Sequence, residues 1–169
     1  MIEFFIGLCV VIILVVGIGV LAGGAPFVPT RTKWIDDALK MAGVGADDVV
    51  VDLGSGNGAV LRSAIKHGAK RAVGYEINPL LVLWSRIRLW RFGRRVEIHG
   101  RDFFHIGLPA DTTAIYLFQV DKVLRKIPEF LNQQKPKIRT KKLRVIVFGF
   151  QIPNKKPIKV QNGMRLYEF

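Results

Sequence analysis

The stretch "VVVDLGSGNGAV", Val49 to Val60, decides how the rest of the chain is interpreted. It opens with an apolar run, which is typical of a β-strand buried on both faces. Asp52 and three glycines at two-residue spacing follow, and apolar residues at helical spacing resume after Ala59. Glycine permits tight turns and lets another group come close to the backbone. The pattern therefore predicts a strand, a glycine loop and a helix, with a ligand lying against the loop.

Strand and helix patterns alternate along the chain from residue 32 onward. We expect strands at 49–53, 71–75, 96–99, 114–120 and 143–150, and helices at 32–42, 59–67, 79–92 and 121–131. This alternation is typical of a mostly parallel sheet with helices on both faces. Asn162 and Gly163 separate two strand-like runs and predict a hairpin. The expected fold class is α/β, a Rossmann-like doubly wound sheet with a C-terminal antiparallel hairpin.

The spacing of the glycines distinguishes between two kinds of nucleotide site. Dinucleotide-binding loops follow G-x-G-x-x-G, whereas this chain has D-x-G-x-G-x-G from Asp52 to Gly58. The next predicted strand ends in "GYEINP", which places Glu76 22 residues after Gly54. A carboxylate at that position can accept hydrogen bonds from both hydroxyls of a ribose. The alternative is that Glu76 is an exposed carboxylate at the end of a strand and binds no ligand.

The loop and "GYEINP" together resemble motif I and the second-strand motif of class I S-adenosylmethionine-dependent methyltransferases. The resemblance implies S-adenosylmethionine as cofactor and the strand order 3-2-1-4-5-7-6, with strand 7 antiparallel. It also implies a set of cofactor-binding residues, which are Asp52, Gly54, Ser55, Gly56, Asn57, Gly58, Glu76, Ile77, Asn78, Asp102 and Phe103. Asp102 and Phe103 would face the adenine, and a helix cap is the alternative role for Asp102.

Candidates for catalysis lie at the end of the fourth predicted strand, where such methyltransferases place groups that face the substrate. Gln119 and Asp121 in "LFQVD" are these candidates, with a helix cap as the alternative role for Asp121. The sequence does not identify a general base. Cys9 is the only cysteine, and the three histidines are scattered along the chain, so no metal site is predicted.

The N-terminal run from Phe4 to Ala22 contains 19 residues and no charged side chain. A helix of that length spans roughly 28 Å, close to the ~30 Å hydrocarbon core of a bilayer. We expect one transmembrane anchor at residues 1–25 and a methyltransferase domain at 26–169; the alternatives are a cleaved signal peptide and a buried helix. Arg31 and Lys33 follow the run, so the positive-inside rule places the domain in the cytoplasm.

The expected domain is strongly basic. The chain has a net charge of +13, and residues 26–169 carry +14 because Glu3 is the only charged side chain before them. Two clusters stand out: "RIRLWRFGRR" from Arg86 to Arg95 and "KPKIRTKKLR" from Lys135 to Arg144. Such clusters attract phosphate groups. Anionic lipid headgroups are the favoured partners, and nucleic acid is the less favoured one.

An apolar anchor followed by "PFVPT", the glycine loop and "GYEINPLLVLWSR" resembles one small family, the lysine methyltransferases that modify the ATP synthase c subunit and the adenine nucleotide translocase. The resemblance implies protein-lysine N-methylation of a membrane-embedded or membrane-associated acceptor. It also implies that Phe27, Pro29 and Thr30 cover the substrate pocket. The tail with "QIPNKKP" departs from the family and leaves the acceptor open. RNA, a small lipid-like acceptor and a noncatalytic nucleotide-binding membrane module remain the alternatives.

Overall fold

The computed structural model describes residues 2–3, 5–7, 10 and 31–169. Within these residues, no helix combines the length and the apolar character needed to cross a bilayer. Most of the predicted anchor lies outside the described residues. The predicted pocket cover, formed by Phe27, Pro29 and Thr30, lies entirely outside the described residues.

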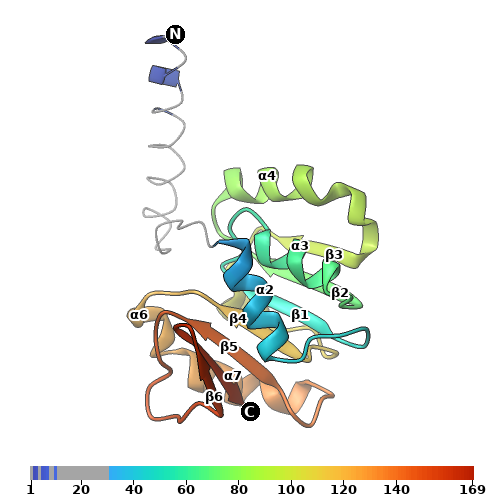
Figure 1. Cartoon of the computed structure of the whole chain (residues 1–169), viewed down its shortest axis with the longest axis vertical. Helices are drawn as coiled ribbons and strands as arrows, with labels where there is room; N and C mark the ends of the chain where they lie inside the picture. The colour runs from blue at the N-terminus through green and yellow to red at the C-terminus, as the bar shows by residue number, and fades with distance from the viewer. Residues whose placement is uncertain (1, 4, 8–9, 11–30) are drawn as a thin grey trace.

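Seven strands form one sheet in the order β3-β2-β1-β4-β5-β7-β6, as the resemblance implied (Figure 1). Strands β1 to β5 pair in parallel, whereas β7 pairs antiparallel with both β5 and β6. The strands are β1 (Val49–Leu53), β2 (Arg71–Tyr75), β3 (Val96–His99), β4 (Ala114–Leu117), β5 (Arg144–Phe148), β6 (Lys159–Gln161) and β7 (Met164–Glu168). The predicted α/β class and the closing hairpin are confirmed.

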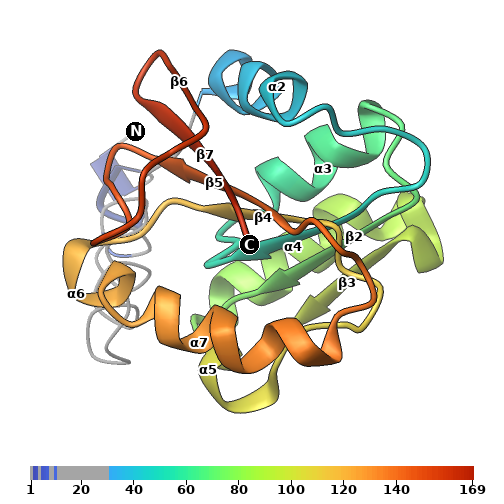
Figure 2. The same cartoon turned by 90° about the horizontal axis from the view of Figure 1, so that it is seen from below.

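Helices cover both faces of the sheet (Figure 2). One face carries α2 (Thr32–Met41), α3 (Ala59–Lys66) and α4 (Pro79–Leu89). The other carries α5 (Phe103–Ile106), α6 (Asp121–Leu124) and α7 (Ile127–Gln134). Short 3-10 helices follow α4 at η1 (Trp90–Arg95) and α7 at η2 (Lys135–Lys137).

The central strand β1 shows why continuous apolar runs form this sheet. All five of its residues are buried. Val50 packs into the core under α2 and α3, whereas Val49 and Val51 pack into the core under α7. Successive side chains of a strand point to opposite faces, so a strand with helices on both sides needs apolar residues at adjacent positions.

Two helix predictions need correction. The single helix expected over 121–131 is wrong, because α6 ends at Leu124 and α7 begins at Ile127. Pro128 lies in the first turn of α7 and has no N–H with which to continue a helical ladder from α6. The helix expected over 79–92 ends at Leu89, and the chain continues as a 3-10 helix that Gly93 interrupts with a φ of 53°.

Candidate active site

The glycine loop is attached to the neighbouring strand at the carboxyl edge of the sheet. The N–H groups of Gly54 and Ser55 both donate to the carbonyl of Tyr75, at 2.9 and 2.8 Å. Gly54, Gly56 and Gly58 all have positive φ angles, of 92°, 52° and 74°. Because L-residues with side chains rarely adopt this region, the loop requires glycine for its own course.

Glu76 follows β2 and is held by two backbone groups of the site. Its Oε2 accepts a hydrogen bond from the Gly56 N–H and its Oε1 accepts one from the Asn78 N–H, both at 2.8 Å. The side chain is buried, with 9% of its surface exposed. Each carboxylate oxygen can accept a second hydrogen bond. The geometry therefore presents two fixed acceptors of the kind that a ribose diol requires.

Asp52 lies next to this carboxylate and is 3% exposed. Burial, and then the negative charge of Glu76, raise the pKa of Asp52 to about 8. Two carboxyl groups in one desolvated site favour either a proton or a bound cation. The site thus suits a ligand that has a diol and a positive charge.

Packing within the protein provides a second reason for two of the loop glycines. A Cβ on Gly54 would lie 2.0 Å from Nε2 of Gln119, and one on Gly58 would lie 2.5 Å from Cδ1 of Leu89. Gly74 in β2 was not singled out by the sequence pattern. A Cβ there would lie 2.7 Å from Oγ of Ser55, which is buried and has no hydrogen-bond partner among the described residues. Ser55 therefore rests on the sheet beneath the loop.

A cavity of about 410 Å³ opens between the segments that follow β2 and β3. It is lined by Ile77 and Pro79, by Val82, Leu83 and Arg86 of α4, and by His99, Gly100 and Arg101. Ile77, which follows Glu76 in the chain, lines this cavity, and its contact with the nucleoside stays a prediction. Asn78 has a further role, because its side chain accepts hydrogen bonds from Leu80 and Leu81 N–H and caps α4.

The two residues expected at the adenine have clear structural roles. Asp102 caps α5 by accepting a hydrogen bond from the Phe104 N–H at 2.9 Å. The Phe103 ring is buried, with the Phe104 and Phe130 rings at 4.3 and 5.5 Å between centroids. The cap that the sequence left as an alternative for Asp102 is present, and the contact with adenine stays a prediction.

The two catalytic candidates differ in how they are held. Gln119 Nε2 donates to the carbonyl of Leu53 at 2.8 Å, which joins the ends of β4 and β1 beside the glycine loop. Asp121 is exposed at the first turn of α6 and forms an ion pair with Arg125 at 2.8 Å. The helix cap suggested as the alternative role for Asp121 is wrong, because the N-cap residue of α6 is Val120 and no described side chain caps this helix. Of the two side chains, only Gln119 contacts the β1 terminus.

Three aromatic rings gather at the same edge, and the sequence pattern did not identify them. Phe148, at the end of β5, lies 5.3 Å from Trp34 of α2 and 5.0 Å from Phe118, which precedes Gln119. The guanidinium of Arg31 lies 5.6 Å from the centroid of the Trp34 ring. These three rings form an apolar wall at the edge of the sheet. Their positions in separate elements left no local signal in the sequence.

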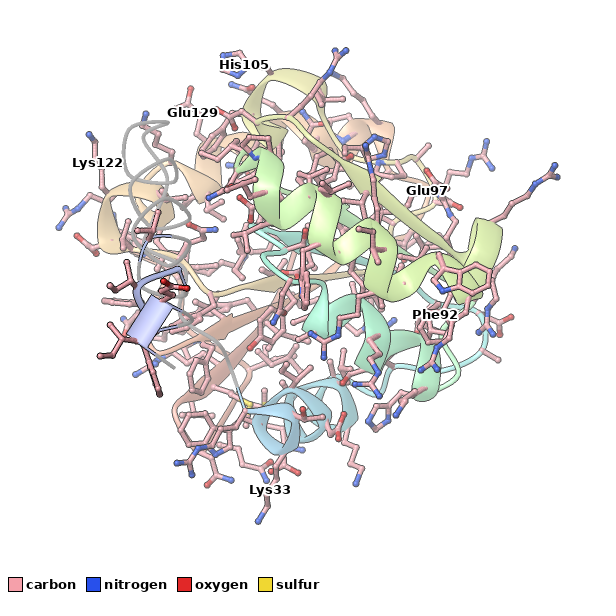
Figure 3. All side chains as sticks on the ribbon, turned by 90° about the horizontal axis from the view of Figure 1, so that it is seen from above. Lys33, Phe92, Glu97, His105, Lys122 and Glu129 are labelled. Atoms are coloured by element: carbon pink, nitrogen blue, oxygen red, sulfur yellow. The ribbon has the colours of Figure 1, made fainter. Side chains whose placement is uncertain are left out.

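The histidines occupy separate surface positions. His67 pairs with Asp36 at 3.2 Å, and His105, labelled in Figure 3, pairs with Asp102 at 3.3 Å. His99 lies 3.7 Å from Glu97. In the described part of the chain, no group of three or more His, Cys, Asp or Glu side chains could hold a metal ion.

The sheet order, the glycine loop and the buried carboxylate define a Rossmann-like methyltransferase fold. The structure resembles that of an RNA methyltransferase from Salinibacter ruber in complex with S-adenosyl-L-homocysteine, with a TM-score of 0.72. The two sequences are 31% identical, and the match covers 84% of this chain and 92% of that one. The sequence model of the ANTKMT methyltransferase domain matches residues 52–159. The chain therefore belongs to the ANTKMT methyltransferase domain family.

The relatives in sequence include lysine N-methyltransferases. The Xenopus laevis lysine N-methyltransferase named for the ATP synthase C-subunit is 35% identical over 76% of this chain and 55% of its own length. A protein-lysine N-methyltransferase of Saccharolobus islandicus is 31% identical over 82% of this chain and 86% of its own length. The chain spans about half the length of the animal ATP synthase C-subunit enzymes that it matches.

Proposed function

We propose that this chain is an S-adenosylmethionine-dependent methyltransferase that modifies lysine side chains of proteins. The observation that carries the proposal is the Glu76 carboxylate, held by Gly56 and Asn78 at the mouth of the glycine loop. The family match and the lysine methyltransferases among the relatives support the same reaction. A structure at 31% identity that was solved with S-adenosyl-L-homocysteine supports the cofactor.

The residues of the site fit this cofactor. Glu76 has one acceptor position left on each oxygen for the ribose hydroxyls. The acidic pair of Asp52 and Glu76 suits the positive charge that the cofactor carries. When bound, the cofactor supplies a methyl group on a sulfonium, so the protein needs no covalent nucleophile. The task of the chain is to align the acceptor and to exclude water.

A lysine acceptor fits the half of the edge formed by β4 and β5. The amine must be neutral to attack a methyl group, and apolar surroundings favour the neutral form of an amine. The rings of Trp34, Phe118 and Phe148 provide such surroundings. The bond from Gln119 Nε2 to Leu53 leaves the amide oxygen of Gln119 to accept a hydrogen bond from the amine. We assign Gln119 this orienting role.

The experiment that tests the proposal uses the full chain, membrane extracts and S-adenosylmethionine with a labelled methyl group. Label should appear in the protein fraction, on lysine by mass spectrometry, and calorimetry should show binding of S-adenosylhomocysteine. The Glu76→Ala variant is the matched inactive control. Label in the lipid fraction would assign a lipid-like acceptor instead. Cofactor binding without label in any fraction would favour the noncatalytic module, and absence of binding would refute the cofactor.

RNA is the second candidate acceptor. The net charge of +13 and the similarity to the Salinibacter ruber RNA methyltransferase favour it. The same labelling experiment separates the two candidates, because ribonuclease treatment would remove label from RNA and leave label on protein.

The proposal includes a membrane location, with residues 1–25 as a single-pass anchor and the domain in the cytoplasm. The uncharged run Phe4 to Ala22 and the basic residues after it support this arrangement. The acceptor is then a membrane-embedded or membrane-associated protein, and anionic headgroups are a further partner. Resistance to alkaline extraction, together with protease sensitivity of the domain only in inverted vesicles, would test it. Release by alkali would contradict it.

A further inference from the structure

Helix α4 is apolar on two opposite sides. Leu81, Val82 and Leu89 are buried against the protein. A second set of large apolar side chains faces solvent, with exposed fractions of 57% for Leu83, 60% for Trp84, 60% for Ile87 and, at the start of η1, 79% for Trp90. A helix on a protein surface usually has polar side chains on its outer face. Within the described residues, the outer face of α4 is therefore apolar and uncovered.

The exposed side chains form one stripe rather than a scatter. Leu83, Ile87 and Trp90 follow at spacings of four and three, and Trp84 is adjacent to Leu83 on the same side of the helix. In Figure 3, no other described helix or strand lies in front of α4. Contiguous exposed apolar patches of this kind mark an interaction surface.

The charge around the stripe has one sign. The segment from Pro79 to Arg95 contains five arginines and no Asp or Glu. Arg86 is anchored by donating to the carbonyl of Ile98 at 2.8 Å, and Arg95 donates to the carbonyl of Ala69 at 2.7 Å. Arg88 and Arg91 lie on the same helix and turn as the stripe. Trp and Leu side chains next to a basic rim are typical of helices that lie in the plane of a membrane interface.

We propose that the outer face of α4 docks into the headgroup region of an anionic bilayer, with the apolar stripe inserted and the arginines on lipid phosphates. Charge complementarity selects this occupant. A second copy of the chain would bring the same uncompensated positive charge to the contact. RNA would satisfy the arginines but would leave Leu83 and Ile87 in water.

Docking through α4 would fix the orientation of the active site. The helix begins at Pro79, three residues after Glu76, so the nucleoside side of the site cannot separate from the docking surface. This consequence rests on the proposed function, whereas lipid binding by α4 does not. The two can be tested apart, because binding of S-adenosylhomocysteine and insertion of α4 have separate readouts.

The test uses tryptophan fluorescence of the full chain in vesicles of phosphatidylcholine and phosphatidylglycerol whose acyl chains are brominated near the headgroup. One variant, Trp34→Phe with Trp90→Phe, retains Trp84 as the reporter. The comparison variant, Trp84→Phe with Trp90→Phe, retains Trp34. Bromine should quench Trp84 about twofold or more and leave Trp34 nearly unchanged, because an interfacial helix is buried ~5–10 Å into the boundary.

Disrupting variants sharpen the result, with Trp90 as the sole tryptophan in a background of Trp34→Phe and Trp84→Phe. Trp84→Ser, in place of Trp84→Phe, together with Ile87→Ser should reduce the quenching of Trp90. The matched control is Ile158→Ser with Val160→Ser, which removes two apolar residues of similar exposure, 62% and 58%, from the opposite edge of the sheet. The control should retain full quenching. Replacing Arg88 and Arg91 with Gln should weaken quenching, by roughly fivefold in affinity for each charge.

Three outcomes would overturn the proposal. The first is equal access of aqueous acrylamide to Trp84 with and without vesicles. The second is protection of Trp84 that rises with protein concentration in the absence of lipid, which would assign the face to a second copy. The third is protection by RNA but not by anionic vesicles. Unchanged binding of S-adenosylhomocysteine in each variant shows that the site is intact, so these outcomes leave the proposed function standing.

Discussion

The carboxyl edge of the sheet has two halves that are built differently. At the ends of β1 and β2, backbone N–H groups hold the buried carboxylate of Glu76 and a second carboxyl lies beside it. At the ends of β4 and β5, one amide contact from Gln119 and three aromatic rings form the surroundings. The first half is a polar site fixed by the main chain, and the second is an apolar wall of side chains.

This difference indicates how the halves divide the work. A ligand with a fixed set of donors requires acceptors whose positions do not vary, and main-chain hydrogen bonds provide them. An acceptor side chain requires shape and low polarity, which side chains from several elements can supply. We therefore expect variants of the first half to affect cofactor affinity and variants of the second to affect recognition of the methyl acceptor.

The largest effect is expected from Gly56→Val. The φ of Gly56 is 52°, and a β-branched residue there is strained. The change would also displace the N–H that donates to Glu76. Affinity for S-adenosylhomocysteine, measured by calorimetry, should fall roughly 100-fold or more. Circular dichroism controls for the fold, and equal affinity for both proteins would contradict the assignment of the loop.

Glu76→Ala is expected to have the next largest effect. The substitution removes both acceptors and leaves the N–H groups of Gly56 and Asn78 without their carboxylate. An unpaired buried polar group costs about 1–3 kcal/mol, so cofactor affinity should fall roughly 5- to 150-fold. Glu76→Gln serves as a partial rescue. The amide has nearly the same shape as the carboxylate, but only one of its two terminal atoms is an acceptor. A change of less than twofold in the alanine variant would show that Glu76 is not part of the cofactor site.

Asp52 predicts a dependence of stability on pH in the protein without cofactor. The folded state keeps a proton on Asp52 up to a pKa of about 8, whereas the unfolded state releases it near 3.8. The unfolded state therefore binds fewer protons in this range, and the free energy of unfolding should fall as pH rises from about 4 to 8. The slope due to Asp52 is at most about 1.4 kcal/mol per pH unit.

Urea denaturation of the wild type and Asp52→Asn at pH 5 and pH 7.5 measures this dependence. The variant should lose much of the slope, since Asn does not titrate. The matched control is Asp121→Asn, because Asp121 is exposed and paired with Arg125. Equal slopes in the wild type and the Asp52 variant would show that Asp52 is already ionised in the folded protein.

The smallest effect is expected from Trp34→Leu in the other half of the edge. The ring is 39% exposed and contacts Phe148. Leu is smaller than Trp and loses apolar contact with the acceptor side chain that is worth about 0.5–1 kcal/mol, so KM for a lysine acceptor should rise roughly 2- to 5-fold. Affinity for S-adenosylhomocysteine should change less than about twofold, because the ring lies in the other half of the edge. A larger effect on cofactor affinity than on KM would contradict the assignment of cofactor binding and acceptor recognition to different halves of the edge.

The prediction from sequence was strongest where one segment contains a complete local signal. The run from Val49 to Gly58 shows its strand, its turn and its requirement for glycine within ten residues. The hairpin at Asn162 and Gly163 is similar, since the turn type depends on these two residues. The predicted helix over 121–131 failed because Pro128 interrupts a pattern whose apolar spacing alone looked continuous.

The sequence by itself determined the sheet class, the glycine loop and the buried carboxylate, because each depends on residues close together in the chain. Only the tertiary structure showed that Gln119 reaches the end of β1, that Gly74 makes room for Ser55 and that Trp34, Phe118 and Phe148 meet. It also showed which side of α4 remains uncovered. Contacts between distant segments depend on how the elements pack. Because α4 is apolar on two sides, its helical periodicity alone does not show which of the two sides the protein covers.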